Sequence, residues 1–257
     1  MDERERILRL LEEGKITAEE AIRLLELLSK KEKRTSFFEI FEEIPEVISE
    51  IFIKIGDSLK THYETLFLSP REKIIIESVS GDIEIFGKEI SEIRIEKTGF
   101  SKVNSEKEFL KISSLKGNLK IETNCQTEIK FSTISGRLAI FSIKKGIDFQ
   151  TFSGKVFGKN LSGKIKGETI SGDIELIVDD FSQIELATKS GEILLELKEN
   201  IEANLEFFGK REKLDCEFSI EIIEEKENYL KGVINKQGNL IKIRNEFGKT
   251  KIRKSNL

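Results

Sequence analysis

A Ser-Gly step recurs along this chain at nearly constant spacing, and it restricts the possible folds more than any other feature. The step lies between apolar residues in "ESVSGDIEI", "TISGRLAI", "TFSGKVFG" and "TISGDIEL". Glycines at the same place in successive repeats are 36, 19, 18, 18 and 19 residues apart, and 36 is two periods. These marker glycines are Gly81, Gly117, Gly136, Gly154, Gly172 and Gly191. A fixed period of about 18 residues is typical of stacked repeat architectures.

Apolar residues alternate with polar ones on both sides of each marker glycine. Ile165 lies seven residues before Gly172, and Ile174 and Leu176 lie two and four residues after it. A strand with one buried face requires such alternation, so each period contributes two short strands joined by a corner. Glycine tolerates the backbone angles of a sharp corner, and a serine hydroxyl can bond to turn amides. The six marker glycines are therefore predicted to be structural corners.

The repeat predicts a mainly β chain in which residues 70–257 form a single-stranded parallel β-solenoid with coils of about 18 residues. A β-propeller is the alternative, although its blades need about 40 residues, twice this period. We expect an irregularity near residues 96–108, where the apolar positions leave the register. After residue 196 the spacing loosens, which predicts less regular coils. The charged tail "KIRKSNL" is expected to protect the far end.

The first 30 residues predict an α-helical hairpin. Gly14 suits the end of one helix, and Thr17 with Glu20 forms a capping box at the start of the next. Two helices of this length cannot bury a sufficient core alone. The hairpin is therefore expected to dock on another copy, on a partner protein or, alternatively, on its own solenoid. The predicted association face consists of Ile7, Leu8, Leu11, Leu24, Leu25 and Leu28.

Residues 31–69 predict a charged linker followed by an amphipathic helix. Apolar residues recur every three or four positions from Phe37 to Leu59, and Pro45 is placed to kink or divide the helix. Its polar face is rich in glutamate, whereas helices that lie on anionic membranes carry Lys and Arg there. We expect the helix to pack on the solenoid, capping its first coil, or within an oligomer. A membrane surface is the less favoured alternative.

Two sequence patterns resemble a known bacterial family. The repeated step of Thr or Ser, any residue, Ser, Gly, Asp and Ile is similar to the hallmark of a β-solenoid family of adhesin-like domains. The stretch "RILRLLEEGKITAEEAIRLLELL" resembles the SHOCT-like hairpin that precedes this solenoid in YvlB-like proteins. The resemblance implies the order hairpin, linker helix and solenoid. It also implies an association with the cell envelope and its stress responses, and no catalytic residues.

Composition narrows the function further. The formal net charge is −4, so the chain as a whole has no attraction for nucleic acid or anionic membranes. Cys125 and Cys216 lie 91 residues apart and form no CxxC pair, which disfavours a zinc or redox site. We find no signal-peptide pattern and no apolar run near 18 residues. We therefore expect a cytoplasmic protein, peripheral to the cell envelope at most.

No pattern in the chain predicts catalysis. The single histidine, His62, lies far in sequence from either cysteine, and "FGKT" is not a phosphate loop because Ile243 replaces its required glycine. We predict no catalytic, cofactor-binding or metal-binding residues. The expected function is a non-enzymatic scaffold or interaction protein that forms a homo-oligomer or binds a protein partner through residues 1–60. A carbohydrate-binding or carbohydrate-active β-helix protein is the alternative, and it would need an exposed aromatic row or an acidic cleft.

Overall fold

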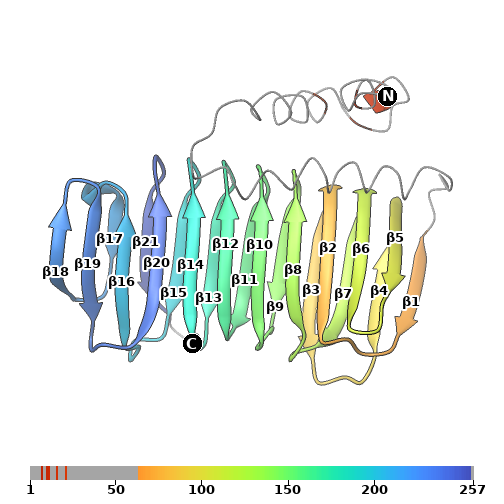
Figure 1. Ribbon diagram of the computed structural model, residues 1–257, viewed down its shortest axis with the longest axis horizontal. Coiled ribbons are helices and arrows are strands. Elements are labelled where there is room, and N and C mark those ends of the chain that lie inside the picture. The colour runs from red at the N-terminus through yellow and green to blue at the C-terminus, as the bar shows by residue number, and fades with distance from the viewer. Residues whose placement is uncertain (1–6, 8–9, 12–15, 17–20, 22–62, 256–257) are drawn as a thin grey trace.

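The computed structural model describes residues 63–255 and, from the N-terminal segment, Ile7, Leu10, Leu11, Ile16 and Ala21. Strands make up 63% of the described residues, and they form two sheets that lie face to face (Figure 1). Within residues 63–255 the helical content is one 3-10 turn, Arg211–Lys213. The described residues form no helix that is long and apolar enough to cross a membrane.

The two sheets, A and B, have ten and eleven strands. In spatial order, sheet A contains β1 (Glu64–Leu68), β4 (Ile93–Lys97), β7 (Leu119–Asn124), β3 (Ile83–Lys88), β9 (Arg137–Phe141), β11 (Lys155–Leu161), β13 (Ile174–Val178), β15 (Ile193–Leu197), β21 (Thr250–Lys254) and β17 (Leu214–Cys216). Sheet B contains β18 (Ile220–Lys226), β19 (Tyr229–Ile234), β16 (Ala203–Phe208), β20 (Asn239–Asn245), β14 (Gln183–Thr188), β12 (Lys164–Thr169), β10 (Gly146–Thr151), β8 (Glu128–Thr133), β2 (Lys73–Ser80), β6 (Phe109–Lys116) and β5 (Phe100–Ser105).

In the centre of the molecule each circuit of the chain, called a coil here, contributes one strand to each sheet. Ile147, Ile165 and Ile184 are aligned across the parallel strands β10, β12 and β14 of sheet B. The strands β11, β13 and β15 of sheet A pair in the same parallel way. Because the aligned residues are one period apart in sequence, each repeated apolar position forms a continuous column of side chains.

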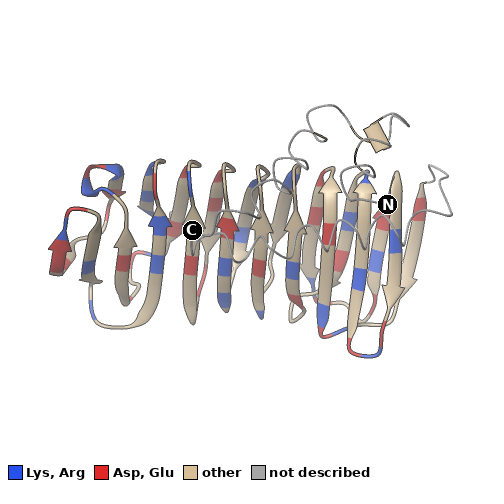
Figure 2. Ribbon diagram, turned by 45° about the horizontal axis from the view of Figure 1, so that its top comes forward, with Lys and Arg blue, Asp and Glu red and all other residues tan. Residues whose placement is uncertain are grey.

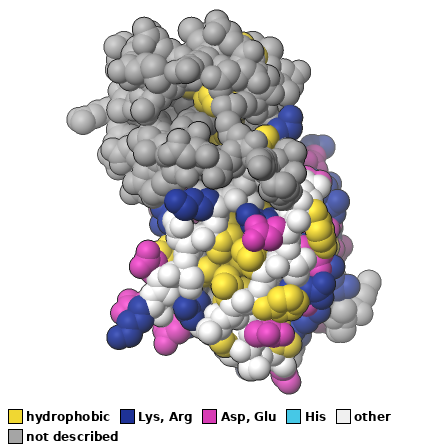
Figure 3. Space-filling view, turned by 90° about the vertical axis from the view of Figure 1, so that its right-hand side faces the viewer, with side chains coloured by type: hydrophobic (Ala, Val, Ile, Leu, Met, Phe, Trp, Pro, Cys, Tyr) yellow, Lys and Arg dark blue, Asp and Glu magenta, His cyan; other side chains and the backbone are white. Residues whose placement is uncertain are grey.

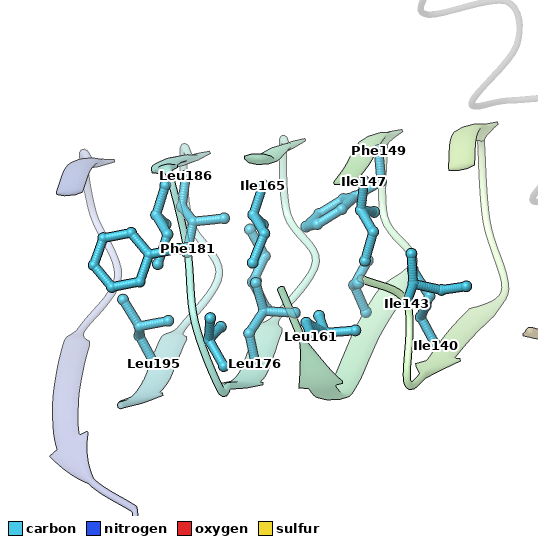
Figure 4. Close-up of a cluster of buried hydrophobic side chains, with 14 of the residues drawn as sticks. Ile140, Ile143, Ile147, Phe149, Leu161, Ile165, Leu176, Phe181, Leu186 and Leu195 are labelled. Carbon is cyan, nitrogen blue, oxygen red and sulfur yellow. The ribbon is translucent and has the colours of Figure 1, made fainter. Parts of the chain in front are cut away.

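The hydrophobic core lies between the two sheets (Figure 4). Phe149 and Ile165 enter it from sheet B, and Leu176 and Leu195 enter it from sheet A. All four side chains are 0% exposed. Burying a side chain of this size contributes about 1.5–3 kcal/mol relative to water. The stacked columns are therefore the main source of stability in the central coils.

The predicted single-stranded parallel β-solenoid is wrong as a description of the fold, because both sheets are mixed. At one end β1, β4 and β7 pair antiparallel, and so do β5 and β6. At the other end β19 pairs antiparallel with both β16 and β18. The physical reason is that residues 93–105 and 203–234 lack the regular spacing. Short turns return the chain there as the antiparallel hairpins β5–β6 and β18–β19, instead of completing a coil.

Spatial order also departs from chain order at both ends. The strand β2 pairs with β6 on one side and β8 on the other, so the second coil lies outside the first. Near the C-terminus β20 inserts between β14 and β16, and β21 inserts between β15 and β17. The charged tail is therefore an internal strand of sheet A as far as Lys254. The prediction that it protects the far end is wrong.

Sheet A begins at Glu64, inside the range predicted as linker and helix. The predicted hairpin of residues 1–30 and the amphipathic helix fall outside the described residues, except for five N-terminal residues, and the described residues contain no helical hairpin. Figure 3 views the end of the stack beside β1 and β5, where apolar side chains lie between the sheet edges. Leu66, Leu68 and Val103 are partly buried against the core at this end.

Candidate interaction surface

The corners form one column of glycines along an edge of the stack. A methyl group added at Gly172 would lie 1.9 Å from the carbonyl oxygen of Gly154, and one added at Gly191 would lie 1.9 Å from that of Gly172. The other marker glycines contact their neighbours in the same way. The structure places all six predicted corner glycines in contact, in the spatial order Gly117, Gly81, Gly136, Gly154, Gly172 and Gly191.

Two different constraints require glycine in this column. Gly81, Gly117 and Gly136 have φ angles of 117°, 139° and 112°, a region that residues with a side chain rarely adopt. Gly154 and Gly172 have no positive φ, so the close carbonyl of the neighbouring coil excludes a side chain there. We predicted glycine at these corners from the dihedral angles alone. Close approach between coils is the more general reason.

Two hydroxyl side chains share the hydrogen bonds of each regular corner. The backbone N–H of Gly172 donates to Thr169 Oγ1 at 2.8 Å, which closes the turn, and the same bond recurs at two neighbouring corners. The Ser171 hydroxyl donates instead to the carbonyl oxygen of Phe152 in the preceding coil, at 3.3 Å. The expectation that the serines bond to turn amides is therefore wrong at these corners, because the threonines do so.

An apolar stripe runs along the outside of these corners. Its side chains belong to a buried cluster that is separate from the core between the sheets. The most buried of them, Val79, Leu115, Ile134 and Phe152, are 0%, 2%, 1% and 9% exposed. We call the whole set the corner stripe: Phe100, Leu115, Val79, Ile134, Phe152 and Ile170. These residues lie at the corners or at the strand ends beside them, and they are withdrawn from water.

Part of the N-terminal segment belongs to the same cluster as the corner stripe. Ile7, Ile16 and Ala21 are 4%, 4% and 2% exposed, and Leu10 and Leu11 are partly buried against this cluster. Figure 1 places the described N-terminal residues beyond the corner edge of the sheets. The predicted association face is therefore described only in part. Its members outside the described residues are Leu8, Leu24, Leu25 and Leu28.

The corner stripe is the feature that sequence reasoning missed, although a signal was present. The residue two positions before the marker glycine is apolar in five repeats: Val79, Leu115, Ile134, Phe152 and Ile170. Exposed positions at or beside corners favour polar residues, so apolar residues at five of them indicate a covered surface. The stripe stops at the next two coils, where Lys189 and Glu246 occupy the equivalent position.

The outward faces of the two sheets differ in chemistry. Figure 2 shows acidic and basic residues interspersed across the strands. On sheet B one column alternates in charge over seven neighbouring strands: Lys130, Asp148, Lys166, Glu185, Lys242, Glu206 and Lys231. Opposite charges on adjacent strands stabilise a sheet, so this column favours a solvated face. On sheet A the outward face mixes charged residues, such as Lys155 and Glu175, with an apolar set that spans five strands: Phe86, Ala139, Phe141, Phe157, Ile177 and Leu194.

The chemistry of the described residues offers few reactive groups. No three His, Cys, Asp or Glu side chains in the described part of the chain lie close enough to hold a metal ion. Cys125 and Cys216 are free thiols, and burial raises the pKa of Cys216. A groove of about 620 Å³ on sheet A is lined mainly by charged side chains, among them Glu217 and Arg253, which are 3.3 Å apart. Neither a thiol nor an imidazole lies among its described lining residues.

A comparison with known protein families matches the N-terminal segment. Residues 2–33 match the model of the SHOCT-like domain, so the predicted SHOCT-like resemblance is confirmed for this segment. No curated protein matches the chain.

Several solved structures resemble the chain at low identity. A "putative cell adhesion protein" from Clostridium sporogenes is 15% identical, with 76% of this chain and 99% of that chain covered and a TM-score of 0.44. A "putative lipid binding protein" from Parabacteroides distasonis is 14% identical, with 77% and 98% covered and a TM-score of 0.34. A "putative adhesin" from the same organism is 11% identical, with 78% and 98% covered and a TM-score of 0.29. The finer identity as a YvlB-like protein stays a prediction.

Proposed function

We propose that this protein is a non-enzymatic interaction protein whose two-sheet body holds the SHOCT-like N-terminal segment along the corner stripe and presents it to a partner. The observation that carries the proposal is the cluster that Ile7, Ile16 and Ala21 share with the corner stripe. If nothing covered these corners, polar residues would be expected there. Two later coils do have polar residues at the equivalent position, Lys189 and Glu246.

Burial along the corner stripe is large enough to hold a short segment. Each buried aliphatic or aromatic side chain contributes about 1.5–3 kcal/mol relative to water. A segment of about 30 residues rarely has a sufficient core of its own, so it needs such a surface. The glycine column and the threonine bonds fix the corners, and the stripe side chains are therefore held at a regular spacing along the stack.

The proposal includes association of the N-terminal segment with a second copy or with another protein. Because Ile7 and Leu11 belong to the stripe cluster, the surface for a partner is expected among the remaining apolar positions of the segment. Among those, the remaining members of the predicted association face are Leu8, Leu24, Leu25 and Leu28. If the full chain is an oligomer, removing residues 1–33 should reduce the mass measured by light scattering to that of a single truncated chain. A link to the cell envelope from a cytoplasmic location is supported by the family resemblance alone.

A matched pair of double variants tests the docking. Ile134→Asp with Phe152→Asp places two charges in the corner stripe, and Ile177→Asp with Phe157→Asp makes the same change on the outward face of sheet A. Hydrogen exchange in residues 1–33 should rise at least about tenfold in the stripe variant and stay near the wild-type rate in the control. Equal exchange in the two variants would contradict the proposal. Far-UV circular dichroism checks that the sheets remain folded.

The aromatic side chains of sheet A give the carbohydrate-binding alternative less support than the corner stripe gives to docking. A sugar needs the open face of an aromatic ring, and the Phe86 ring stacks on Phe141 with centroids 5.0 Å apart and an interplanar angle of 8°. The ammonium group of Lys120 lies over the Phe86 ring, 5.8 Å from its centroid. Because β3 lies between β7 and β9, the lysine and Phe141 approach the ring from opposite sides. The aromatic row is present, but both faces of its Phe86 ring are covered.

A further inference from the structure

The free edge of sheet B at β18 has features that neither the core nor the corner stripe explains. Among the described residues β18 pairs with β19 on one side and ends the sheet (Figure 1). Ile222 and Ile223 in this strand are 47% and 58% exposed. The outer N–H and C=O groups of an edge strand form a template on which another strand can pair. Natural edges are usually short or charged. This seven-residue edge strand carries charges, but it also exposes two isoleucines, which favours a docking function.

The side chains of β18 are sorted between the two faces of the sheet. Ile222 pairs with Gly232, and Gly232 pairs with the fully buried Leu205, so Ile222 lies on the core side. Glu221 and Glu224 project from the outward side, which Glu224 shares with its pairing partner in β19. A strand added beside β18 would therefore meet an apolar neighbour on one face and carboxylates on the other.

We propose that β18 is a docking edge for an extended segment of a partner protein in which Lys or Arg alternates with branched apolar residues. The segment would continue sheet B through main-chain hydrogen bonds. Its apolar side chains would cover Ile222, and its cations would pair with Glu221 and join Lys226 at Glu224 across the strands. Residues 220–227 contain four glutamates and one lysine, and Figure 2 shows acidic residues at this end of the sheet. Charge complementarity therefore selects a basic segment.

The same charges disfavour a second copy as the occupant. Antiparallel pairing of β18 with itself would bring Glu221 of one copy close to the glutamates near the other end of the second copy's strand. Like charges on directly opposed residues destabilise a sheet. A register shift between Ile222 and Glu224 also places Glu225 on the core side, opposite Leu230. A carboxylate at this position disfavours pairing with a purely apolar strand.

The experiment measures binding of a short fluorescein-labelled peptide of alternating Lys and Val to the full chain by fluorescence anisotropy. Glu221→Lys with Glu224→Lys should weaken binding at least about tenfold, because two attractions become repulsions. The control is Glu84→Lys with Glu108→Lys, which changes the net charge equally at two other exposed glutamates and should leave binding unchanged. A peptide methylated on alternate backbone nitrogens cannot pair with an edge strand and should not bind.

Three outcomes would overturn the proposal. Equal loss in the control variant would mean that net charge alone attracts the peptide. Equal binding of the methylated peptide would exclude pairing with a strand edge. A fall in the light-scattering mass of the β18 variant relative to the full chain would assign the edge to self-association. The proposal concerns a surface apart from the corner stripe, so its failure leaves the proposed function untouched.

Discussion

The centre of the stack and its two ends are built from the same alternation of apolar and polar residues, yet only the centre follows the repeat. From β8 to β15 the strands of each sheet are neighbours in chain order and pair parallel. At the ends, antiparallel hairpins and inserted strands replace this order. A local period therefore determines the fold only where the nearest strand in space is also the next repeat in the chain.

The largest expected contrast between centre and end is in the packing of the core. Ile165→Ala in β12 removes a side chain that is 0% exposed and should lower the free energy of unfolding by about 2–5 kcal/mol. Ile222→Ala in β18 changes a side chain that is 47% exposed and should alter it by less than about 0.5 kcal/mol. Urea unfolding of both variants measures the difference. Equal losses would show that the end is packed as tightly as the centre.

The corner column gives the next contrast. Gly172→Ala would place a methyl group 1.9 Å from the Gly154 carbonyl oxygen, so two coils would have to separate at a cost of about 1–3 kcal/mol. Gly158→Ala, also in the centre, meets the terminal carbons of Leu161 and Leu176 at 2.5 and 2.8 Å. Those side chains can rotate away, so the loss should stay below about 1 kcal/mol. If Gly172→Ala and Gly158→Ala had the same unfolding midpoint, backbone contact between coils would not be what fixes the spacing of the corner glycines.

The central coils could be predicted from the sequence because each coil has neighbours like itself. In these coils the sequence spacing of Gly136, Gly154 and Gly172 therefore predicts the register between neighbouring strands. The reversal at Gly99, which has a φ of 75°, and the insertion of β20 and β21 depend on which distant strands compete for a place. No local spacing encodes that competition, so extending the period past residue 196 gave the wrong strand order and the wrong place for the tail.

The two candidate surfaces differ in the same way. The corner stripe repeats with the marker glycines, so a tabulation of the residue two positions earlier would have revealed it from Val79 to Ile170. The exposure of Ile222 depends on where sheet B ends, which follows from the antiparallel pairing of β18 with β19. The strand "IEIIEEK" has the alternation of any half-buried strand in its first residues. Its position at an edge is a property of the assembled sheet.

Hydrogen bonds at one central corner should separate two adjacent hydroxyl groups. Thr169→Val removes the oxygen that accepts the Gly172 N–H and leaves a buried donor without its partner, which should cost about 1–2 kcal/mol. Ser171→Ala removes a bond to the Phe152 carbonyl, which already accepts the Ser171 N–H at 3.0 Å. That loss should stay below about 0.5 kcal/mol. Thermal unfolding of the two variants would contradict this account if Ser171→Ala proved the more damaging.

The smallest expected effect is a pH dependence of opposite sign at the centre and at the end. Burial raises the pKa of Glu168 in β12, and the Lys226 hydrogen bond lowers the pKa of Glu224 in β18. The contribution of Glu168 to stability is therefore fully present in acid and is lost as the pH rises through its folded pKa. The contribution of Glu224 is present at neutral pH and is lost as the pH falls through its lowered pKa.

These signs can be measured by urea unfolding of Glu168→Gln and Glu224→Gln from about pH 7 to about pH 3. At neutral pH the glutamine at position 168 removes the cost of a half-buried charge, so this variant should equal or exceed the wild type in stability. The glutamine at position 224 removes a favourable ion pair, so that variant should be slightly less stable. Both differences should shrink toward acid pH. A shift of stability in the same direction for both variants at neutral pH would mean that Glu168 and Glu224 are equally solvated. The centre and the end of the stack would then differ only in their apolar packing.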